Sequence, residues 1–110
     1  MKNTKKPVES VFFADSKQQA SQEIFSGICV KSMWQGANKG KAVVVTIAPG
    51  SKWQGVDTHE TSSEEIFVVD GVFNDGDRDY QAGTFIHYPV GSSHIPQSST
   101  GCTLFVFYPD

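Results

Sequence analysis

The chain has 110 residues, of which 19% are charged, and a formal net charge of −3 at pH 7. Its length is that of a single domain, and an acidic chain without a basic stripe is a poor candidate for binding nucleic acid. It contains no apolar run that would form a signal peptide or cross a membrane, and its cysteines, Cys29 and Cys102, fit no zinc-finger spacing. We therefore expect a cytoplasmic protein with buried thiols.

The N-terminal part of the chain, residues 1–22, is expected to be an arm outside the main fold. Residues 7–13 are typical of an irregular extended segment. Asp15 or Ser16 can cap one or two helical turns after it, because their side-chain oxygens accept hydrogen bonds from free backbone N–H groups. Strand-forming residues dominate from there on, and residues 23–110 are expected to form the main fold.

Short strands are predicted along the rest of the chain. β-Branched and aromatic residues are concentrated at residues 24–25, 28–31, 42–47, 65–69, 84–88 and 103–108. Asp70-Gly71 is predicted to close the strand before it, and residues 74–77 form a tight turn of residues that tolerate positive φ. Many short strands, with glycine and proline between them and little helix, predict an all-β sandwich or barrel.

Several of these strands are apolar on both faces. The runs are Val43-Val44-Val45, residues 66–69 and residues 104–107. A strand with one face in water would alternate apolar and polar residues. Continuous runs indicate that the second face is covered too, by the N-terminal arm or by a second subunit, and we expect both. The predicted assembly is therefore a homodimer.

One stretch, residues 57–94, carries the residues with metal-binding chemistry. Asp57 and His59 are two positions apart, so on an extended chain their side chains point the same way. Glu64 follows after a polar turn, and His94 comes after a turn that contains proline and glycine. Two imidazoles and a carboxylate that met at one point would form a metal site with positions left open for a substrate.

A third histidine, His87, lies between Ile86 and Tyr88 in a predicted strand. Its side chain either lines the cavity, as an acid, a base or a spare ligand, or makes an ordinary hydrogen bond within the strand. The sequence leaves both alternatives open. We keep His87 as the candidate catalytic residue.

The residues around His94 resemble the second conserved motif of the cupin superfamily. The matching positions are Gly83, Pro89-Val90-Gly91, His94 and Ser98, at the spacing of that motif. The last position is usually asparagine, so Ser98 is a departure from the pattern. Proline and glycine force the turn that presents the histidine on the next strand.

The residues around His59 resemble the first cupin motif, which reads His-x-His, three or four residues, Glu, six residues, Gly. Counting back six residues from the glycine selects Glu64, and His59 then resembles the second histidine, with Asp57 in place of the first. With three intervening residues, Thr58 and Glu60 would instead stand at the histidine positions. We prefer the first register because histidine is the expected ligand type there.

The resemblance extends over most of the chain. It is greatest to small stand-alone cupins and to the cupin domain of zinc-binding anti-sigma factors of the ChrR type. It implies a double-stranded β-helix, or jelly-roll, barrel over residues 23–110, often as a dimer. It also implies one divalent metal ion (zinc, iron, manganese or nickel) on His59, Glu64 and His94, with Asp57 as fourth ligand or as its support.

Two functions remain open. The first is a metal-dependent enzyme with a small molecule in the barrel and dioxygenase-like or isomerase-like chemistry, because two histidines and one carboxylate are the ligands of non-haem iron oxygenases. The second is a non-catalytic metal-binding sensor or regulatory module like the anti-sigma cupin. We favour the enzyme, because a chain that consists almost entirely of the barrel has few other residues with which to bind a protein partner. A metal-free cupin is a third alternative, suggested by Asp57.

Overall fold

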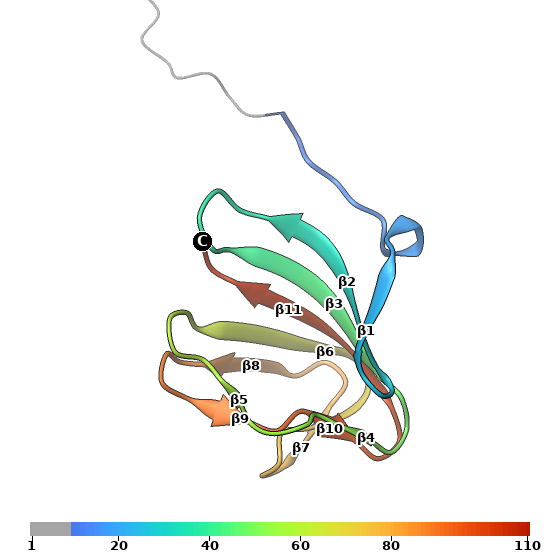
Figure 1. The fold of residues 1–110 in the computed structure, drawn as a ribbon. Helices are drawn as coiled ribbons and strands as arrows, with labels where there is room; N and C mark the ends of the chain where they lie inside the picture. The colour runs from blue at the N-terminus through green and yellow to red at the C-terminus, as the bar shows by residue number, and fades with distance from the viewer. Residues whose placement is uncertain (1–9) are drawn as a thin grey trace, which may run out of the picture.

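The computed structural model describes residues 10–110, and nearly all of their regular structure is antiparallel β-strand (Figure 1). The elements are η1 (Ser16–Gln18), β1 (Ser21–Phe25), β2 (Ile28–Gln35), β3 (Lys41–Ile47), β4 (Ser51–Lys52), β5 (Asp57–Thr58), β6 (Glu64–Asn74), β7 (Asp79–Gln81), β8 (Phe85–Tyr88), β9 (Ser93–His94), β10 (Gln97–Ser98) and β11 (Cys102–Tyr108). In this part of the chain no helix is long and apolar enough to span a membrane.

The long strands form one curved wall in the order β1-β2-β3-β11-β6, and β8 pairs with the first half of β6. The second half of β6 pairs with β7 and β10, β10 pairs with β4, and β5 pairs with β9. In Figure 1 these short strands lie across from β2, β3 and β11, so the sheet closes much of the way into a barrel. The predicted all-β barrel is confirmed.

The prediction that Asp70-Gly71 closes a strand is wrong. β6 continues to Asn74, and its register against β11 shifts between Val68 and Asp70. Gly71 has a φ of +77°, and a Cβ built on it would lie 2.1 Å from the carbonyl oxygen of Gly101. Only glycine fits so close an approach. The glycine that was predicted to end a strand instead bends one continuous strand, which carries β6 from the long strands to the short ones.

Alternate residues of the long strands form the core. Val43, Val106 and Ile66 are cross-strand neighbours on β3, β11 and β6, and each is at most 8% exposed. Phe73, beyond the bend in β6, is fully buried in the same cluster. Burying a side chain of this kind stabilises the fold by about 1.5–3 kcal/mol. The core therefore holds both halves of β6 in place.

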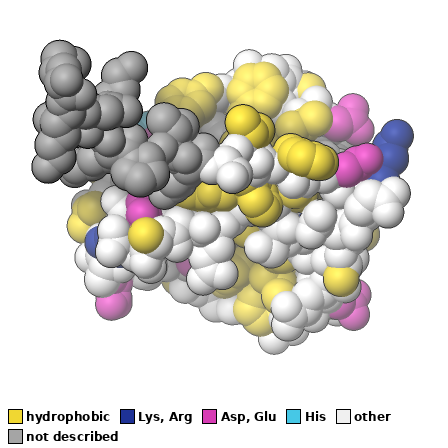
Figure 2. Space-filling view, turned by 90° about the horizontal axis from the view of Figure 1, so that it is seen from above, with side chains coloured by type: hydrophobic (Ala, Val, Ile, Leu, Met, Phe, Trp, Pro, Cys, Tyr) yellow, Lys and Arg dark blue, Asp and Glu magenta, His cyan; other side chains and the backbone are white. Residues whose placement is uncertain are grey.

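The opposite face of the same strands carries a row of apolar side chains. Val44, Phe105, Phe67 and Phe85 are successive cross-strand neighbours from β3 to β8. The three phenylalanines are 40% to 62% exposed, and we call this row the outer aromatic face. Figure 2 shows exposed hydrophobic side chains gathered over part of the surface, with charged side chains at its edge. Within the described chain this second face of the wall is thus uncovered.

The N-terminal arm, as far as it is described, does not cover the outer aromatic face. Residues 10–15 lead away from the sheet in Figure 1, and Val11, Phe12 and Phe13 are 62% to 89% exposed. The arm joins the sheet at the edge strand β1, at the other end of the wall from β6 and β8. The expected cover is therefore wrong for these residues, while residues 1–9 lie outside the described part.

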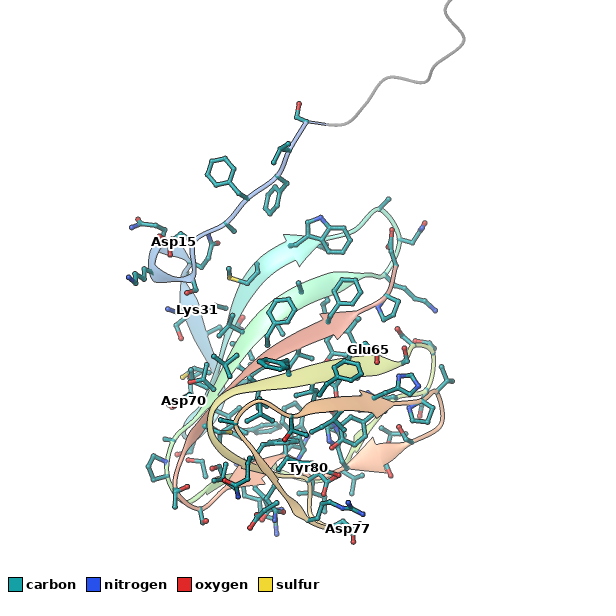
Figure 3. All side chains as sticks on the ribbon, turned by 180° about the vertical axis from the view of Figure 1, so that it is seen from behind. Asp15, Lys31, Glu65, Asp70, Asp77 and Tyr80 are labelled. Carbon is teal, nitrogen blue, oxygen red and sulfur yellow. The ribbon has the colours of Figure 1, made fainter. Side chains whose placement is uncertain are left out.

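The short helix before β1 is present where the sequence predicts a cap. The side chain of Asp15 accepts a hydrogen bond of 2.9 Å from the backbone N–H of Lys17. Lys31 Nζ, on β2, donates to the carbonyl oxygen of Ser16 at 2.9 Å, and Figure 3 shows Asp15 and Lys31 at this junction. The first contact caps η1, and the second holds it against the sheet.

Candidate metal centre

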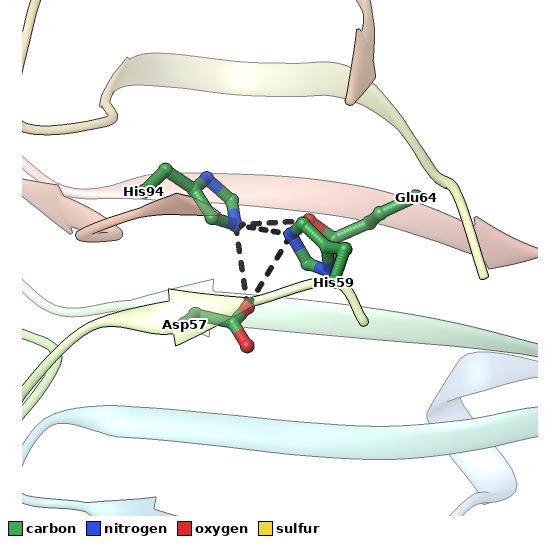
Figure 4. A group of neighbouring side chains, drawn as sticks. All are labelled: Asp57, His59, Glu64 and His94. Atoms are coloured by element: carbon green, nitrogen blue, oxygen red, sulfur yellow. Dashed lines mark hydrogen bonds and ion pairs between the residues drawn. The ribbon is translucent and has the colours of Figure 1, made fainter. Parts of the chain in front are cut away.

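Four side chains meet at one end of the barrel, on the strands that close it (Figure 4). Asp57 lies on β5, His59 directly after it, Glu64 at the start of β6 and His94 on β9. Pairing of β5 with β9 sets Asp57 opposite His94. The structure therefore brings together the four residues that the sequence marks as candidate ligands, from two segments at least 30 positions apart.

The turn before β9 ties the two segments together. The backbone N–H of Gly91 donates to the carbonyl oxygen of His59 at 2.7 Å, and the N–H of His59 donates to that of Ser92 at 2.9 Å. Gly91 has a φ of +92°, a conformation that costs other residues more than glycine. The proline- and glycine-containing turn thus fixes the backbone of His59 as well as that of His94.

The distances between the candidate ligand atoms are short and similar. Nε2 of His59 and Nε2 of His94 are 3.0 Å apart, and each lies 3.0 Å from Oε1 of Glu64. Oδ2 of Asp57 is 3.2 Å from His94 Nε2 and 3.8 Å from His59 Nε2. Donor atoms about 2.1 Å from one metal ion, in tetrahedral or octahedral geometry, would be roughly 3.0–3.4 Å apart. The spacing fits a single cation.

The chemistry of these atoms fits a cation as well. His59, Glu64 and His94 are 3% to 6% exposed. Glu64 Oε1 lies close to both rings but accepts a regular hydrogen bond from neither. It has no other hydrogen-bond partner among the described residues. A buried carboxylate oxygen without a donor is costly unless a cation satisfies it. This group could therefore hold a divalent metal ion.

The two carboxylates also act on the protonation of His94. Burial by itself would lower the pKa of His94, but its hydrogen bond to Asp57 and the nearby charge of Glu64 raise that pKa to about 9. In the metal-free protein at neutral pH the ring is therefore a positively charged imidazolium, and this charge stands beside Glu64 Oε1 where a metal ion would otherwise be. A metal ion that binds Nε2 must displace the proton there.

Packing orients the ring of His94. Nδ1 of His94 is buried and has no hydrogen-bond partner in the described part of the chain. The ring of Tyr88 lies against it, with centroids 4.2 Å apart, and Phe73 meets it edge-on at 6.2 Å. These two aromatic side chains therefore direct Nε2 of His94 toward Glu64.

A buried carboxylate, Asp75, holds Tyr88 in turn. Asp75 accepts hydrogen bonds of 2.9 Å from the hydroxyls of Tyr88 and Tyr80, and further bonds from the backbone N–H groups of Asp77 and Arg78. Burial by itself would raise the pKa of Asp75, but these donors lower it below its ordinary value. Asp75 therefore anchors both a turn and a wall of the candidate site.

Tyr108 supports Glu64 from the last strand. Its hydroxyl donates a hydrogen bond to Oε2 of Glu64. Burial and then the charge of Glu64 raise the pKa of Tyr108 far above its ordinary value, so the hydroxyl keeps its proton at any physiological pH. The two oxygens of Glu64 thus have different surroundings, one against the histidines and one against Tyr108.

Three residues that the sequence offered as candidates lie elsewhere. His87 is on the outer side of β8, and its side chain is 55% exposed. Its Nδ1 lies 2.6 Å from Oε1 of Glu65 (Figure 3). The structure therefore does not bring the candidate catalytic residue to the cavity. Thr58 and Glu60, which the alternative motif register would place at the site, are both exposed and outside the group.

Sequence reasoning missed the supporting residues. Tyr108 and Glu64 are 44 positions apart, and the sequence does not show which strands are neighbours. One signal was available for Tyr108, because it follows Leu104 and Val106 in alternation and both of these face inward. In the sequence Asp75 looks like an ordinary turn residue. Only the structure shows the two tyrosines that donate hydrogen bonds to it.

A cavity of about 240 Å³ opens onto the candidate metal centre. Its walls are mainly apolar side chains from the two sides of the barrel, including Ile28, Val45 and Trp53. Asp57, Glu64, His94, Tyr108 and Lys41 line it as well. The barrel thus combines a mostly apolar interior with a few polar groups at one end, the usual composition of a small-molecule site.

A family model described as the ChrR cupin-like domain matches residues 9–109 of the chain. No curated protein sequence matches it. Among solved structures, an RmlC-like cupin from Shewanella frigidimarina superposes with a TM-score of 0.77 at 22% identity, covering 90% of each chain. The polyketide cyclase RemF from Streptomyces resistomycificus superposes with a TM-score of 0.76 at 17% identity, covering 91% of this chain and 80% of that one.

The anti-sigma factor ChrR of Rhodobacter sphaeroides, solved in complex with SigE, is also similar. It superposes with a TM-score of 0.72 at 16% identity, and the match covers 84% of this chain and 50% of the ChrR chain. Identities this low show a common fold and no more. Because the similar structures include both an enzyme and a regulatory protein, function must be argued from the site.

Proposed function

The chain belongs to the ChrR cupin-like family, and we propose that it is a metal-dependent enzyme acting on a small molecule inside the barrel. One observation carries this proposal. Asp57, Glu64 and His94 form part of the wall of the 240 Å³ cavity, so a molecule in the cavity would lie directly against the metal ion. A site for metal alone would need no such space beside it.

We assign Asp57, His59, Glu64 and His94 as ligands of one divalent ion. Two nitrogens and two carboxylate oxygens are a harder donor set than three histidines and one carboxylate. They suit iron(II) or manganese as well as zinc or nickel. When bound, such an ion supplies Lewis acidity and, in the case of iron, reactivity toward dioxygen, which fits dioxygenase-like or isomerase-like chemistry.

The chain's own residues would bind and orient the substrate. The apolar walls exclude water and hold the body of the molecule. Lys41 is the one lysine or arginine that lines the cavity in the described structure, and its Nζ lies 5.1 Å from the ring centre of Tyr108. With two carboxylates balancing a divalent ion, Lys41 leaves the site with a positive charge. We therefore expect a substrate with an anionic or oxygen-rich end.

Filling the cavity is expected to abolish substrate binding and to leave the metal in place. Val45 lines the cavity, whereas its neighbour Val44 points to the outer face of the same strand. Thermal unfolding of metal-loaded protein with small carboxylates and β-dicarbonyl compounds tests this. A true ligand at 100 times its Kd stabilises the fold by about 2.7 kcal/mol. That gain should appear in the wild type and Val44→Phe, and disappear in Val45→Phe.

Compounds that pass this test are then assayed for turnover. Conversion by the wild type but not by metal-free protein supports an enzyme. A compound that stabilises Val45→Phe as much as the wild type would show that the barrel interior is not the substrate site.

A regulatory function is the second candidate, and the family match favours it. The family model is named for ChrR, and the ChrR structure contains its sigma factor partner. We infer that in this alternative the metal or a cavity ligand would change the affinity for another protein. A ligand that binds the cavity and is recovered unchanged after long incubation with metal-loaded protein would favour this function over the enzyme.

We also propose that the outer aromatic face is an interface between two copies of the chain. Sedimentation equilibrium at micromolar concentration should give twice the 12.0 kDa mass of one chain. Phe85→Ser should shift the equilibrium to monomer with little loss of monomer stability, because Phe85 is largely exposed. Val56→Ser, at another exposed apolar residue, is the matched control. A single species near 12 kDa for the wild type would contradict the dimer.

We propose a cytoplasmic location on the basis of the cysteines. Cys29 and Cys102 are both free, and Cys102 is buried. Burial raises the pKa of Cys102 to about 11, so its thiol is unreactive at neutral pH. Thiols persist in this form in a reducing compartment.

A further inference from the structure

The two carboxylate oxygens of Glu64 are held by different parts of the barrel. Oε1 lies 3.0 Å from Nε2 of both His59 and His94 and makes no hydrogen bond. Oε2 accepts the hydrogen bond of the Tyr108 hydroxyl. Glu64 is 3% exposed, so water has little access to either oxygen. One oxygen is therefore free for a cation and the other is already occupied.

We propose that Tyr108 is a positioning residue that makes Glu64 a one-oxygen ligand of the metal. This inference rests on the proposed metal site. For Glu64 to chelate through both oxygens, Oε2 would have to leave a buried, charge-assisted hydrogen bond, and the Tyr108 hydroxyl would be left without a partner. Tyr108 would thereby leave one more coordination position of the metal open for a substrate.

The position of Tyr108 suits this role. It is paired with Lys41 across β11 and β3, and the Lys41 ammonium lies 5.1 Å from the centre of its ring. The ring also forms part of the cavity wall. A ring held between a strand neighbour and the core can present its hydroxyl at only a few points, and Glu64 Oε2 is at one of them.

The test is Tyr108→Phe, loaded with cobalt(II), whose visible absorption reports coordination number. Phenylalanine keeps the ring and removes the hydroxyl, so Glu64 is free to chelate. We expect the bands to weaken, as they do when coordination number rises, and cobalt affinity to change about 10- to 100-fold, with one ion still bound. Tyr80→Phe is the matched control, because Tyr80 also donates to a buried carboxylate, Asp75, but contacts none of the four ligands.

The outcomes separate this inference from the proposed function. Bands and affinity in Tyr108→Phe equal to those of the wild type would overturn the role of Tyr108 and leave the metal site standing. A wild-type protein that takes up no cobalt would overturn both. A change of the same size in Tyr80→Phe would show a general loss of structure and would also overturn the proposal.

A measurement on the wild type keeps the proposal testable if Tyr108→Phe misfolds. In a crystal structure of the zinc-bound wild type, Oε2 of Glu64 should remain on the Tyr108 hydroxyl and only Oε1 should bind zinc. A chelating Glu64 in that structure would overturn the proposal.

Discussion

Glu64→Ala is expected to leave the purified protein without stoichiometric metal, whereas Glu65→Ala is expected to retain it. Glu64 Oε1 lies 3.0 Å from a ring nitrogen of each histidine in the group, while Glu65 binds His87 on the outer face. Loss of a ligand should weaken binding by more than the roughly 10- to 100-fold caused by loss of a supporting group. Elemental analysis after dialysis against one metal concentration measures the difference.

The histidines give the same contrast and a second control. His94→Ala should lose the metal, and His87→Ala, at an exposed histidine, should keep it. Circular dichroism should show an unchanged strand signal in all four variants, because the core residues are untouched. Metal retained in Glu64→Ala but absent from Glu65→Ala would show that the motif register has been misassigned.

Metal affinity should also rise with pH. The pKa of His94 in the metal-free fold is raised to about 9, so at pH 7.5 a bound metal should release roughly one proton from this ring. Below pH 9 the apparent affinity should fall by about tenfold per pH unit from this group alone. Titration in weakly buffered solution with a pH indicator counts the protons. Affinity independent of pH between 7 and 9 would contradict the raised pKa.

Asp75→Ala is expected to cause the largest loss of stability of any single polar substitution proposed for this chain. Asp75 is 9% exposed and binds two tyrosine hydroxyls and two backbone N–H groups. A buried group left without its partner costs about 1–3 kcal/mol, so removing this carboxylate should lower the free energy of unfolding by about 3–5 kcal/mol. Tm should fall by roughly 10–20 °C.

Two variants and the pH dependence check this assignment. Asp77→Ala, at an exposed residue of the same turn, should leave Tm nearly unchanged, and Tyr80→Phe should cost about 1 kcal/mol. The folded pKa of Asp75 is lowered, so its stabilisation is present above the unfolded value of about 3.9 and is lost as pH falls through the folded value. Equal losses in Asp77→Ala and Asp75→Ala would refute the role given to the buried carboxylate.

The pattern of the sequence was sufficient to locate the longer strands, although not the end of β6, and with the cupin resemblance it selected the four side chains that the fold brings together. Alternation along an extended chain puts Asp57 and His59 on one side. The resemblance to the first cupin motif, with its count of six residues back from Gly71, selects Glu64. The turn before His94 then supplies the second segment. Each of these features depends on residues a few positions apart, so it can be recognised in the sequence alone.

Other features were decided only by the tertiary structure. Alternation shows which residues share a face but not which face is inside, and strands apolar on both faces, such as β3, give no contrast between the two. That is why His87 could be a cavity residue in the sequence and lies outside in the fold. The bend at Gly71 depends on the close approach of Gly101, and the bond between Tyr108 and Glu64 depends on β11 lying beside β6. Such contacts join residues far apart in the chain, and burial of the apolar faces selects them.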